Sequence, residues 1–424
     1  MLRRIYFTIL TLLIYQPVAN ALPFGTFDPR SLAMGGTGVS SGTSANASYY
    51  NPALLALTRQ DEDFSLEAPV LGARIADPEN LEDALDAYQA ANHEAKMTTA
   101  INDFNTTPSV ANANAASDAL TNLDTGIKSL SNKPVILEAN LGVVIGVPSP
   151  DFGVSIATNF RALAGVELNY TTEDSALINA YATELSSVAS GNLPNVSDTN
   201  LYSGGQLRDI SGRLTSTINV RGALIQDTGI SIGTMFNLGG VNLAMGITPK
   251  TVDFTTYDYA IGMQEADIDE DLGKIEYSDA NVDVGLVAHL GGGIKFGVVG
   301  KNLVQRSYTT ALGNEMVLKP QVRAGISHHT FMTTFAIDVD VTQNEPLGLD
   351  EKTQYVGAGL EINLIDTLQV RLGIKENRLA TVTDKDKTVK SVGLGFSPFG
   401  IHIDLAYAES EAEKAASLQF GFQF

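Results

Sequence analysis

The chain ends in LQFGFQF, residues 418–424, in which apolar residues alternate with glutamine and glycine. Successive side chains of a β-strand point to opposite faces, so this stretch predicts a strand with one apolar face, formed by Leu418, Phe420, Phe422 and Phe424. A terminal strand of this kind invites aggregation if its edge stays unpaired. We therefore expect residues 416–424 to pair with the first strand of a closed sheet.

The same alternation recurs upstream and predicts fourteen strands. Ile401, Ile403, Leu405 and Tyr407, for example, alternate with histidine, aspartate and alanine. Counting back from the C-terminus, the expected strands span residues 416–424, 400–409, 387–397, 366–376, 353–363, 330–342, 317–327, 293–304, 281–290, 240–262, 213–237, 151–171, 134–147 and 62–76. The strand at 213–237 is expected to contain a bulge at 227–229.

A soluble β-sandwich would show the same periodicity. The composition of the face opposite the apolar one therefore has to distinguish a sandwich in water from a barrel in a membrane. Glycine and charged residues recur there, as in the polar lumen of a membrane barrel. Short turns also alternate with longer polar loops, which are expected near 263–280, 305–316, 343–352, 377–386 and 409–415. We expect an all-β fold, a transmembrane antiparallel β-barrel of about 14 strands (12–16). A soluble periplasmic β-protein stays as the alternative.

Composition excludes several classes of function. The chain has 424 residues, 44% of them hydrophobic, and contains no cysteine. Disulfides, thiolate nucleophiles and cysteine-ligated zinc are therefore excluded. With 27 Lys and Arg against 48 Asp and Glu, the formal net charge is −21. Such a charge opposes binding to phosphates, so nucleic acid is not an expected partner.

The first residues indicate export. Arg3 and Arg4 precede an apolar run from Ile5 to Tyr15, and Ala19-Asn20-Ala21 follows as a small-x-small cleavage site. This order is typical of a secretory signal peptide, and the run is too short for a membrane-spanning helix, which needs about 20 residues. We expect residues 1–21 to be a signal peptide and the protein to reside in the outer membrane of a Gram-negative bacterium.

Two stretches lack the strand pattern. Residues 78–131 place Leu81, Leu85 and Tyr88 at helical spacing, and residues 173–200 show a shorter helical pattern. We expect a helical hairpin or a loosely ordered insertion at 78–131 and a second helical insertion at 173–200, both in outer loops. A solvated cap over the barrel mouth is favoured over a specific binding role, because loop length alone does not establish a ligand.

A glycine-rich motif follows the expected signal peptide. The sequence DPRSLAMGGTGV spans residues 28–39, and NPA spans residues 51–53. No Lys-Ser/Thr pair follows the glycines, so a phosphate-binding loop is not predicted. Glycine permits tight turns and proline fixes a bend, so we expect a compact segment that fits inside a barrel. Its motif residues are Met34, Gly35, Gly36, Gly38, Asn51, Pro52 and Ala53.

These motifs, followed by strands that run to a terminal Phe, resemble the long-chain fatty-acid transporter (FadL-like) superfamily of outer-membrane barrels. More closely, DPRSLAMGG at 28–36 and ASYYNPALL at 47–55 resemble the barrel-type conjugal transfer protein TraF family. The resemblance implies fourteen strands and an N-terminal plug segment, here residues 22–60, with residues 61–424 forming the barrel. A terminal Phe after alternating aromatics also resembles the signal that the barrel-assembly machinery recognises, which assigns that role to Phe420, Phe422 and Phe424.

Charged and polar residues are expected to line the lumen. The candidates are Asp283, His289, Lys295, Arg323, Asp338, Asp340, Glu361, Arg371, His402 and Asp404. Two interpretations stay open. Opposite charges can form a network that fills the barrel and seats the N-terminal segment, or they can line a permeation path for a polar solute.

No pattern predicts catalysis, a metal site or a cofactor. His328 and His329 are adjacent on an expected turn, where their side chains diverge, so a shared metal ion is not expected. No serine is marked out as a nucleophile by its sequence context, and no 12-residue calcium loop is present in the sequence.

The glycine-rich motif and the NPA segment favour a barrel for passive uptake of small hydrophobic or amphipathic compounds, without an enzymatic step. The alternative is a structural or interaction component of a conjugal transfer or envelope assembly, which rests on the closer family resemblance and the large insertions. Expected partners are outer-membrane lipid and lipopolysaccharide, the barrel-assembly machinery, a small hydrophobic ligand, and conjugation or envelope proteins.

Overall fold

The computed structural model describes residues 27–57, 63–187, 213–262, 271–345, 347–350, 352–365, 367–379 and 388–424, together with the backbone of residues 20–21, 188–189, 202–203 and 206–207. Most of the expected signal peptide lies outside these residues. So do parts of the expected plug segment, at 22–26 and 58–60, and the end of the second insertion, at 190–200.

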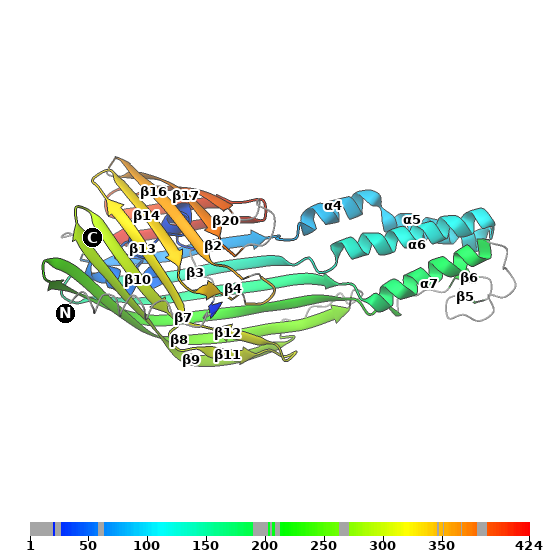
Figure 1. The fold of residues 1–424 in the computed structure, drawn as a ribbon, viewed down its shortest axis with the longest axis horizontal. Coiled ribbons are helices and arrows are strands. Elements are labelled where there is room, and N and C mark those ends of the chain that lie inside the picture. Colours follow the sequence, from blue (N-terminus) through cyan, green and yellow to red (C-terminus); the bar gives the residue numbers. More distant parts are fainter. Residues whose placement is uncertain are drawn as a thin grey trace, which may run out of the picture.

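Fourteen antiparallel strands close into a barrel (Figure 1). In chain order they are β2 (Ser65–Ala76), β3 (Val135–Val147), β4 (Gly153–Asn169), β7 (Thr217–Leu238), β8 (Val241–Gly262), β9 (Lys274–Gly291), β10 (Ile294–Lys301), β13 (Gln321–His329), β14 (Thr333–Asp340), β16 (Tyr355–Ile365), β17 (Leu368–Asn377), β18 (Thr388–Phe396), β19 (Ile401–Glu409) and β20 (Glu413–Gln423). Each strand pairs with its neighbours in the chain, and β20 pairs with β2, where Leu418 lies opposite Leu71. The predicted fold class and strand count are confirmed.

Alternation along each strand separates an apolar exterior from a polar interior. On β19, Ile403, Leu405 and Tyr407 are exposed on the outer face, whereas Asp404 is buried. The same holds on β3, where Leu141 is exposed and its neighbour Asn140 is buried. An apolar exterior around a polar interior is the arrangement that a barrel in hydrocarbon requires.

Two details of the predicted strands are wrong. The expected bulge at 227–229 is absent, because β7 pairs with β4 without a register shift from Thr217 to Gly233. The ladder between β7 and β8 is interrupted opposite Pro249, which has no N–H to donate. The predicted longer loop at 409–415 is also wrong, since only residues 410–412 separate β19 from β20.

Residues 27–57, which we call the plug, lie inside the barrel. They contain α2 (Pro29–Ala33), α3 (Ala47–Tyr50) and the 3-10 helix η1 (Pro52–Ala56). Asp28 caps α2 by accepting hydrogen bonds from the backbone N–H groups of Arg30 and Ser31. One apolar core joins η1 and α3 to the inner faces of β8, β9 and β10, through Leu54, Leu55, Ala244, Val287 and Val299 among others. Another core joins α2 to β18, β19 and β20.

Three short pairings complete the described strands. β11 (Arg306–Thr309) and β12 (Glu315–Leu318) form a hairpin between β10 and β13. β15 (Gln343–Asn344) pairs in parallel with β1 (Asn20–Ala21), and β5 (Tyr202–Ser203) pairs with β6 (Gln206–Leu207).

The two insertions form four helices, α4 (Leu81–Ala91), α5 (His93–Thr106), α6 (Val110–Leu130) and α7 (Thr172–Ala189), which we call the helical projection. α5, α6 and α7 pack around Phe104, Leu120, Tyr181 and Leu185. The first insertion thus has three helices where a hairpin or a loosely ordered segment was expected. Figure 1 shows the helices extending away from the barrel, so the expected cap over its mouth is wrong. None of the described helices is both long and apolar enough to cross a membrane.

Candidate functional site

The barrel interior contains most of the residues that the sequence singles out, and the plug motif packs backbone against backbone on its wall. A Cβ added to Gly373 would lie 2.1 Å from the Gly35 nitrogen, and one added to Gly359 would lie 2.4 Å from the Met34 oxygen. Gly35 also has a φ of +69°, which a side chain disfavours. Glycines on both sides therefore let the plug approach β16 and β17 more closely than any other residue would permit.

The rest of the motif forms hydrogen bonds to the wall. Asp338 accepts from the backbone N–H groups of Gly38, at 2.8 Å, and Val39, at 2.9 Å. The Asn51 side-chain amide donates to the Val39 carbonyl at 2.9 Å and to the Leu286 carbonyl at 3.2 Å. The Asn51 side chain also accepts from the N–H of Ala53 at 3.1 Å, which starts η1. Pro52 packs on Gly246 of β8.

Buried ion pairs fix the plug at its α2 end. Arg30 of the plug donates two hydrogen bonds of 2.9 Å to the carboxylate of Glu361. Arg371 lies 2.8 Å from the same carboxylate and also pairs with Asp404. The side chains of Arg30, Glu361 and Arg371 are all largely shielded from solvent. A bidentate Arg–carboxylate pair is strong and directional, so it sets both the position and the orientation of α2.

Three further groups continue the network. Arg323 pairs with Asp340 at 2.6 Å and donates to the Gly36 carbonyl at 3.1 Å. Asp283 pairs with Lys250 at 3.1 Å. His402 lies 2.7 Å from the buried carboxylate of Glu67.

The remaining predicted residues lie elsewhere. His289 and Lys295 face each other across β9 and β10, half-buried, towards the short turn that joins these strands. Phe420 and Phe422 are exposed on the outer face of β20, and Phe424 pairs with Phe64 through the backbone. The lumen-lining and assembly roles of these residues remain proposals.

A second ionic cluster was not predicted from the sequence. Arg74 lies 2.7 Å from Glu413, 3.1 Å from Asp350 and 3.6 Å from Glu138. Arg161 also pairs with Glu138. Arg74, Glu138 and Arg161 belong to predicted strands and alternate with outward apolar residues, so the same alternation could have found them.

One part of the inner wall is apolar. Leu163, Ala223, Ile225 and Phe254 of the wall are covered by the β11–β12 hairpin, whose Tyr308 ring stacks on Phe254 with 4.1 Å between centroids. We call this group, with Val252, Met316, Leu318 and Leu347, the inner apolar cluster. It is the only large hydrophobic cluster in the described part of the barrel interior that contains no plug residue.

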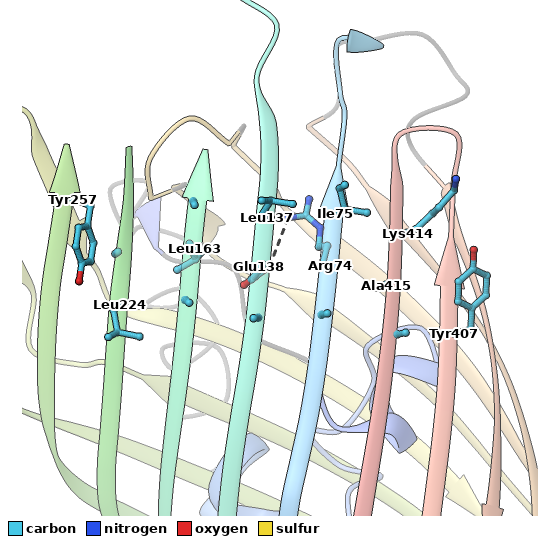
Figure 2. Close-up of a pocket in the computed structure, with 16 residues that line it drawn as sticks. Arg74, Ile75, Leu137, Glu138, Leu163, Leu224, Tyr257, Tyr407, Lys414 and Ala415 are labelled. Atoms are coloured by element: carbon cyan, nitrogen blue, oxygen red, sulfur yellow. Dashed lines mark ion pairs between the residues drawn. The ribbon is translucent and has the colours of Figure 1, made fainter. Parts of the chain in front are cut away.

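The outer face of the same wall is hollowed. A groove of about 680 Å³ crosses β20, β2, β3, β4 and β7 (Figure 2). Its floor is a row of four alanines that face one another across the ladders, namely Ala416, Ala73, Ala139 and Ala162. Ile75, Leu137 and Leu224 rise beside it. Leu163 and Ala223 of the inner apolar cluster line it as well, so the wall between groove and cluster is thin here.

The helical projection is attached to the barrel through Asp174. Its carboxylate accepts from the N–H groups of Thr215 and Ser216, each at 2.8 Å, directly before β7 begins. Burial raises the pKa of Asp174, but the hydrogen bonds from Ser216 and Thr215 outweigh it and hold the pKa below its ordinary value of 3.8. Asp124 similarly joins α6 to α7, with 2.9 Å to the Tyr170 hydroxyl and 3.1 Å to the Asn179 amide.

The described residues contain no group of three or more His, Asp or Glu side chains that could hold a metal ion. The arrangement instead consists of a polar interior largely occupied by the plug, an apolar cluster within it and a groove outside it.

A family model described as "F plasmid transfer operon, TraF, protein" matches residues 48–340. The chain belongs to this family. No curated protein sequence matches it.

Solved structures match this TraF-family chain over nearly its whole length. The P. putida toluene transporter TodX has a TM-score of 0.50 and 11% sequence identity, covering 94% of this chain and 98% of that one. A TodX deletion mutant, described as a monoaromatic hydrocarbon channel, has a TM-score of 0.51 at 11% identity, covering 94% and 99%. A Pseudomonas aeruginosa FadL homologue has a TM-score of 0.49 at 9% identity, covering 96% and 99%. The two TodX matches show that the chain shares the TodX fold.

Proposed function

We propose that this protein is an outer-membrane barrel for passive uptake of small hydrophobic or amphipathic compounds, acting without a chemical step. One observation carries the proposal: the inner apolar cluster and the outer groove meet at one stretch of wall, through Leu163 and Ala223. An apolar compound finds matching surface on both sides of this wall, whereas the other apolar clusters of the inner wall are packed against the plug. Transport of a hydrocarbon by TodX, a protein of the same fold, supports this proposal.

In this mechanism the compound enters from the side of the long loops and displaces the β11–β12 hairpin from the inner apolar cluster. It then leaves sideways between β3, β4 and β7, which requires the continuous ladder of these strands to open locally. Ala164 and Gly222 are paired on their outer face, directly above Ala162 and Leu224. Passage along the barrel axis would have to separate the buried pairs of Arg30 and Glu361, because the plug occupies the axis. Breaking such a pair leaves a buried charge uncompensated, which is strongly unfavourable.

The test is uptake of radiolabelled toluene by cells that carry the protein in their outer membrane. Ala139→Leu and Ala162→Leu place larger side chains on the groove floor and are expected to slow uptake several-fold. Ala324→Leu is the matched control, because Ala324 faces outward on β13, away from the groove. Equal uptake by the groove variants and the control would refute the sideways route. Unchanged uptake after deletion of residues 22–60 would count against a gating role of the plug.

A second candidate function is favoured by the helical projection. Its α4 helix has no buried residue and stands clear of the barrel, so it offers surface to another protein. The family description names a plasmid transfer operon, which supports a structural role in a conjugal transfer or envelope assembly. Deleting residues 78–131 and measuring mating efficiency and partner recovery tests it. Lost mating with unchanged toluene uptake would favour assembly, and the reverse result would favour uptake.

The proposed location and partners follow from the exterior. The exposed apolar face of the strands fits outer-membrane lipid, and the outer loops lie where lipopolysaccharide would be. Phe420, Phe422 and Phe424, on the closing strand, are proposed to be recognised by the barrel-assembly machinery.

A further inference from the structure

Two buried chambers lie between the plug and the barrel wall. The first, of about 60 Å³, is bordered by Gly35 and Gly36 of the plug and by Arg74, Arg323 and Asp338. The second, of about 70 Å³, is bordered by Tyr49 and Tyr50 of the plug and by Asn140, Asn302 and Gln321. By the same measure one water molecule needs roughly 10–15 Å³, so each chamber has room for several.

The two chambers share part of their border. Phe27 and Arg161 are the two described residues that border both of them. The Arg161 guanidinium lies 5.7 Å from the centre of the Phe27 ring, in cation–π contact. Phe27 and Arg161 therefore form the border that the two chambers share, and their contact holds them together there.

Residues that border the two chambers carry buried polar atoms without a hydrogen-bond partner. In the second chamber they are the Gln321 side-chain nitrogen, the Asn302 side-chain oxygen and the Tyr49 hydroxyl. Gln321 is 4% exposed and Asn302 is 8% exposed. In the first chamber one carboxylate oxygen of Asp338, which is 2% exposed, has no partner either. Buried donors and acceptors are almost always hydrogen-bonded, so these atoms indicate a polar occupant.

The charges around the chambers indicate which polar occupant fits. Four cationic and four anionic side chains border the first chamber, namely Arg74, Arg161, Arg323 and Lys375, and Glu138, Asp338, Asp350 and Glu413. Three cationic and two anionic side chains border the second. Neither chamber has the single-sign lining that selects anions or cations, so an uncharged hydrogen-bonding molecule fits best.

We infer that the two chambers bind water and small uncharged polar molecules, and that they form a hydrated path past the plug with its constriction at Phe27. This path is distinct from the proposed hydrocarbon route, because that route lies along the inner apolar cluster and the outer groove. A hydrocarbon in the chambers would leave the Gln321 and Asn302 atoms without partners. The hydrated path can therefore be tested independently of the uptake of hydrophobic compounds.

The experiment measures osmotic water permeability and urea permeability of proteoliposomes by stopped-flow light scattering. Vesicles with the full protein are expected to exceed protein-free vesicles in both. Phe27→Ala widens the constriction and is expected to raise both several-fold. Gln321→Leu replaces a polar group of the second chamber by an apolar one and is expected to lower both below the level of the unsubstituted protein.

Two further variants separate the path from general loosening of the plug. Phe152→Ala is the matched control, since Phe152 is exposed outside both chambers, near the turn between β3 and β4. In the double variant Phe27→Ala/Gln321→Leu, the gain from Phe27→Ala is expected to be largely lost if the flow passes through the second chamber. Correct folding is checked by the shift in gel migration on boiling.

The inference is overturned if neither the vesicles with the unsubstituted protein nor those with Phe27→Ala are more permeable to water and urea than protein-free vesicles. It is equally overturned if Gln321→Leu leaves the gain from Phe27→Ala intact. Because toluene uptake is measured separately, a negative result here leaves the proposed function standing.

Discussion

Gly373→Ala is predicted to loosen the plug. The added methyl group would lie 2.1 Å from the Gly35 nitrogen and 2.5 Å from the Met34 carbonyl carbon. Ordinary van der Waals contact begins at 3.4 Å, so the plug backbone or β17 has to move by about 1.3 Å. Both of these atoms are backbone, which cannot rotate aside, and the Ser391 hydroxyl lies at 2.5 Å as well.

That displacement also strains the hydrogen bonds around Ser391, whose hydroxyl accepts from the Gly35 N–H at 3.2 Å and donates to the Ala33 carbonyl at 3.0 Å. Overpacking of this kind costs about 1–3 kcal/mol. If the loss falls on the docking of the plug, its undocked fraction rises by roughly 5- to 150-fold.

The chain has no cysteine, so a single introduced thiol reports on the plug. Ser41 is suitable because it is 8% exposed and its hydroxyl has no partner. The rate of maleimide labelling of Ser41→Cys in detergent is expected to rise by the same factor in the Gly373→Ala background. Gly300→Ala on β10 is the control, since the atom nearest to its added methyl group would be the end of the Leu303 side chain, which can rotate aside. Equal labelling rates in both backgrounds would show that the plug does not depend on this close contact.

Other expected outcomes concern the ion pairs, the helical projection and the last strand. Arg371→Met leaves the carboxylates of Glu361 and Asp404 buried without their shared partner and is expected to destabilise the barrel by about 3–5 kcal/mol, measured by urea unfolding in detergent. Because the folded pKa of Asp174 is depressed, the stability it adds is present above its ordinary pKa of 3.8 and is lost as the pH falls through the folded value. Proteolysis of the helical projection should therefore increase below about pH 4. Asp174→Asn should show that susceptibility already at pH 7, and Asp118→Asn, at an exposed position of α6, should not. Phe424→Ala is expected to lower the amount of assembled, heat-modifiable barrel, and an unchanged amount would contradict the proposed signal.

The strands could be predicted because alternation is a local property. β8, for example, alternates between buried and more exposed residues from Ala244 to Asp258, and the turn before it contains Gly239 and Gly240. The predicted bulge failed because Asp227 and Gly229 resemble a break, whereas the ladder there is interrupted by Pro249 on the partner strand. That cause is not visible within residues 213–237 alone.

The interior was harder to predict, because its partners are far apart in the sequence. Alternation places Glu361 and Arg371 on an inward face, but nothing local shows that Arg30 joins them from a position 331 residues away. Without the fold, the sequence likewise does not show which wall glycines contact the plug, as Gly359 and Gly373 do. The chambers at Phe27 depend on packing between the plug and ten or more strand positions, and no periodicity encodes such a cavity.

The long separation between Arg30 and Glu361 has a consequence for assembly. The plug emerges early from export, yet α2 packs on β17 to β20, which come last. Until the barrel has closed around α2, Glu361 of β16 cannot pair with Arg30, and the charge of Arg30 must stay in water. Completion of the cylinder and seating of its N-terminal core should thus be one late, cooperative event, with slow kinetics set by the most distant contacts in the chain.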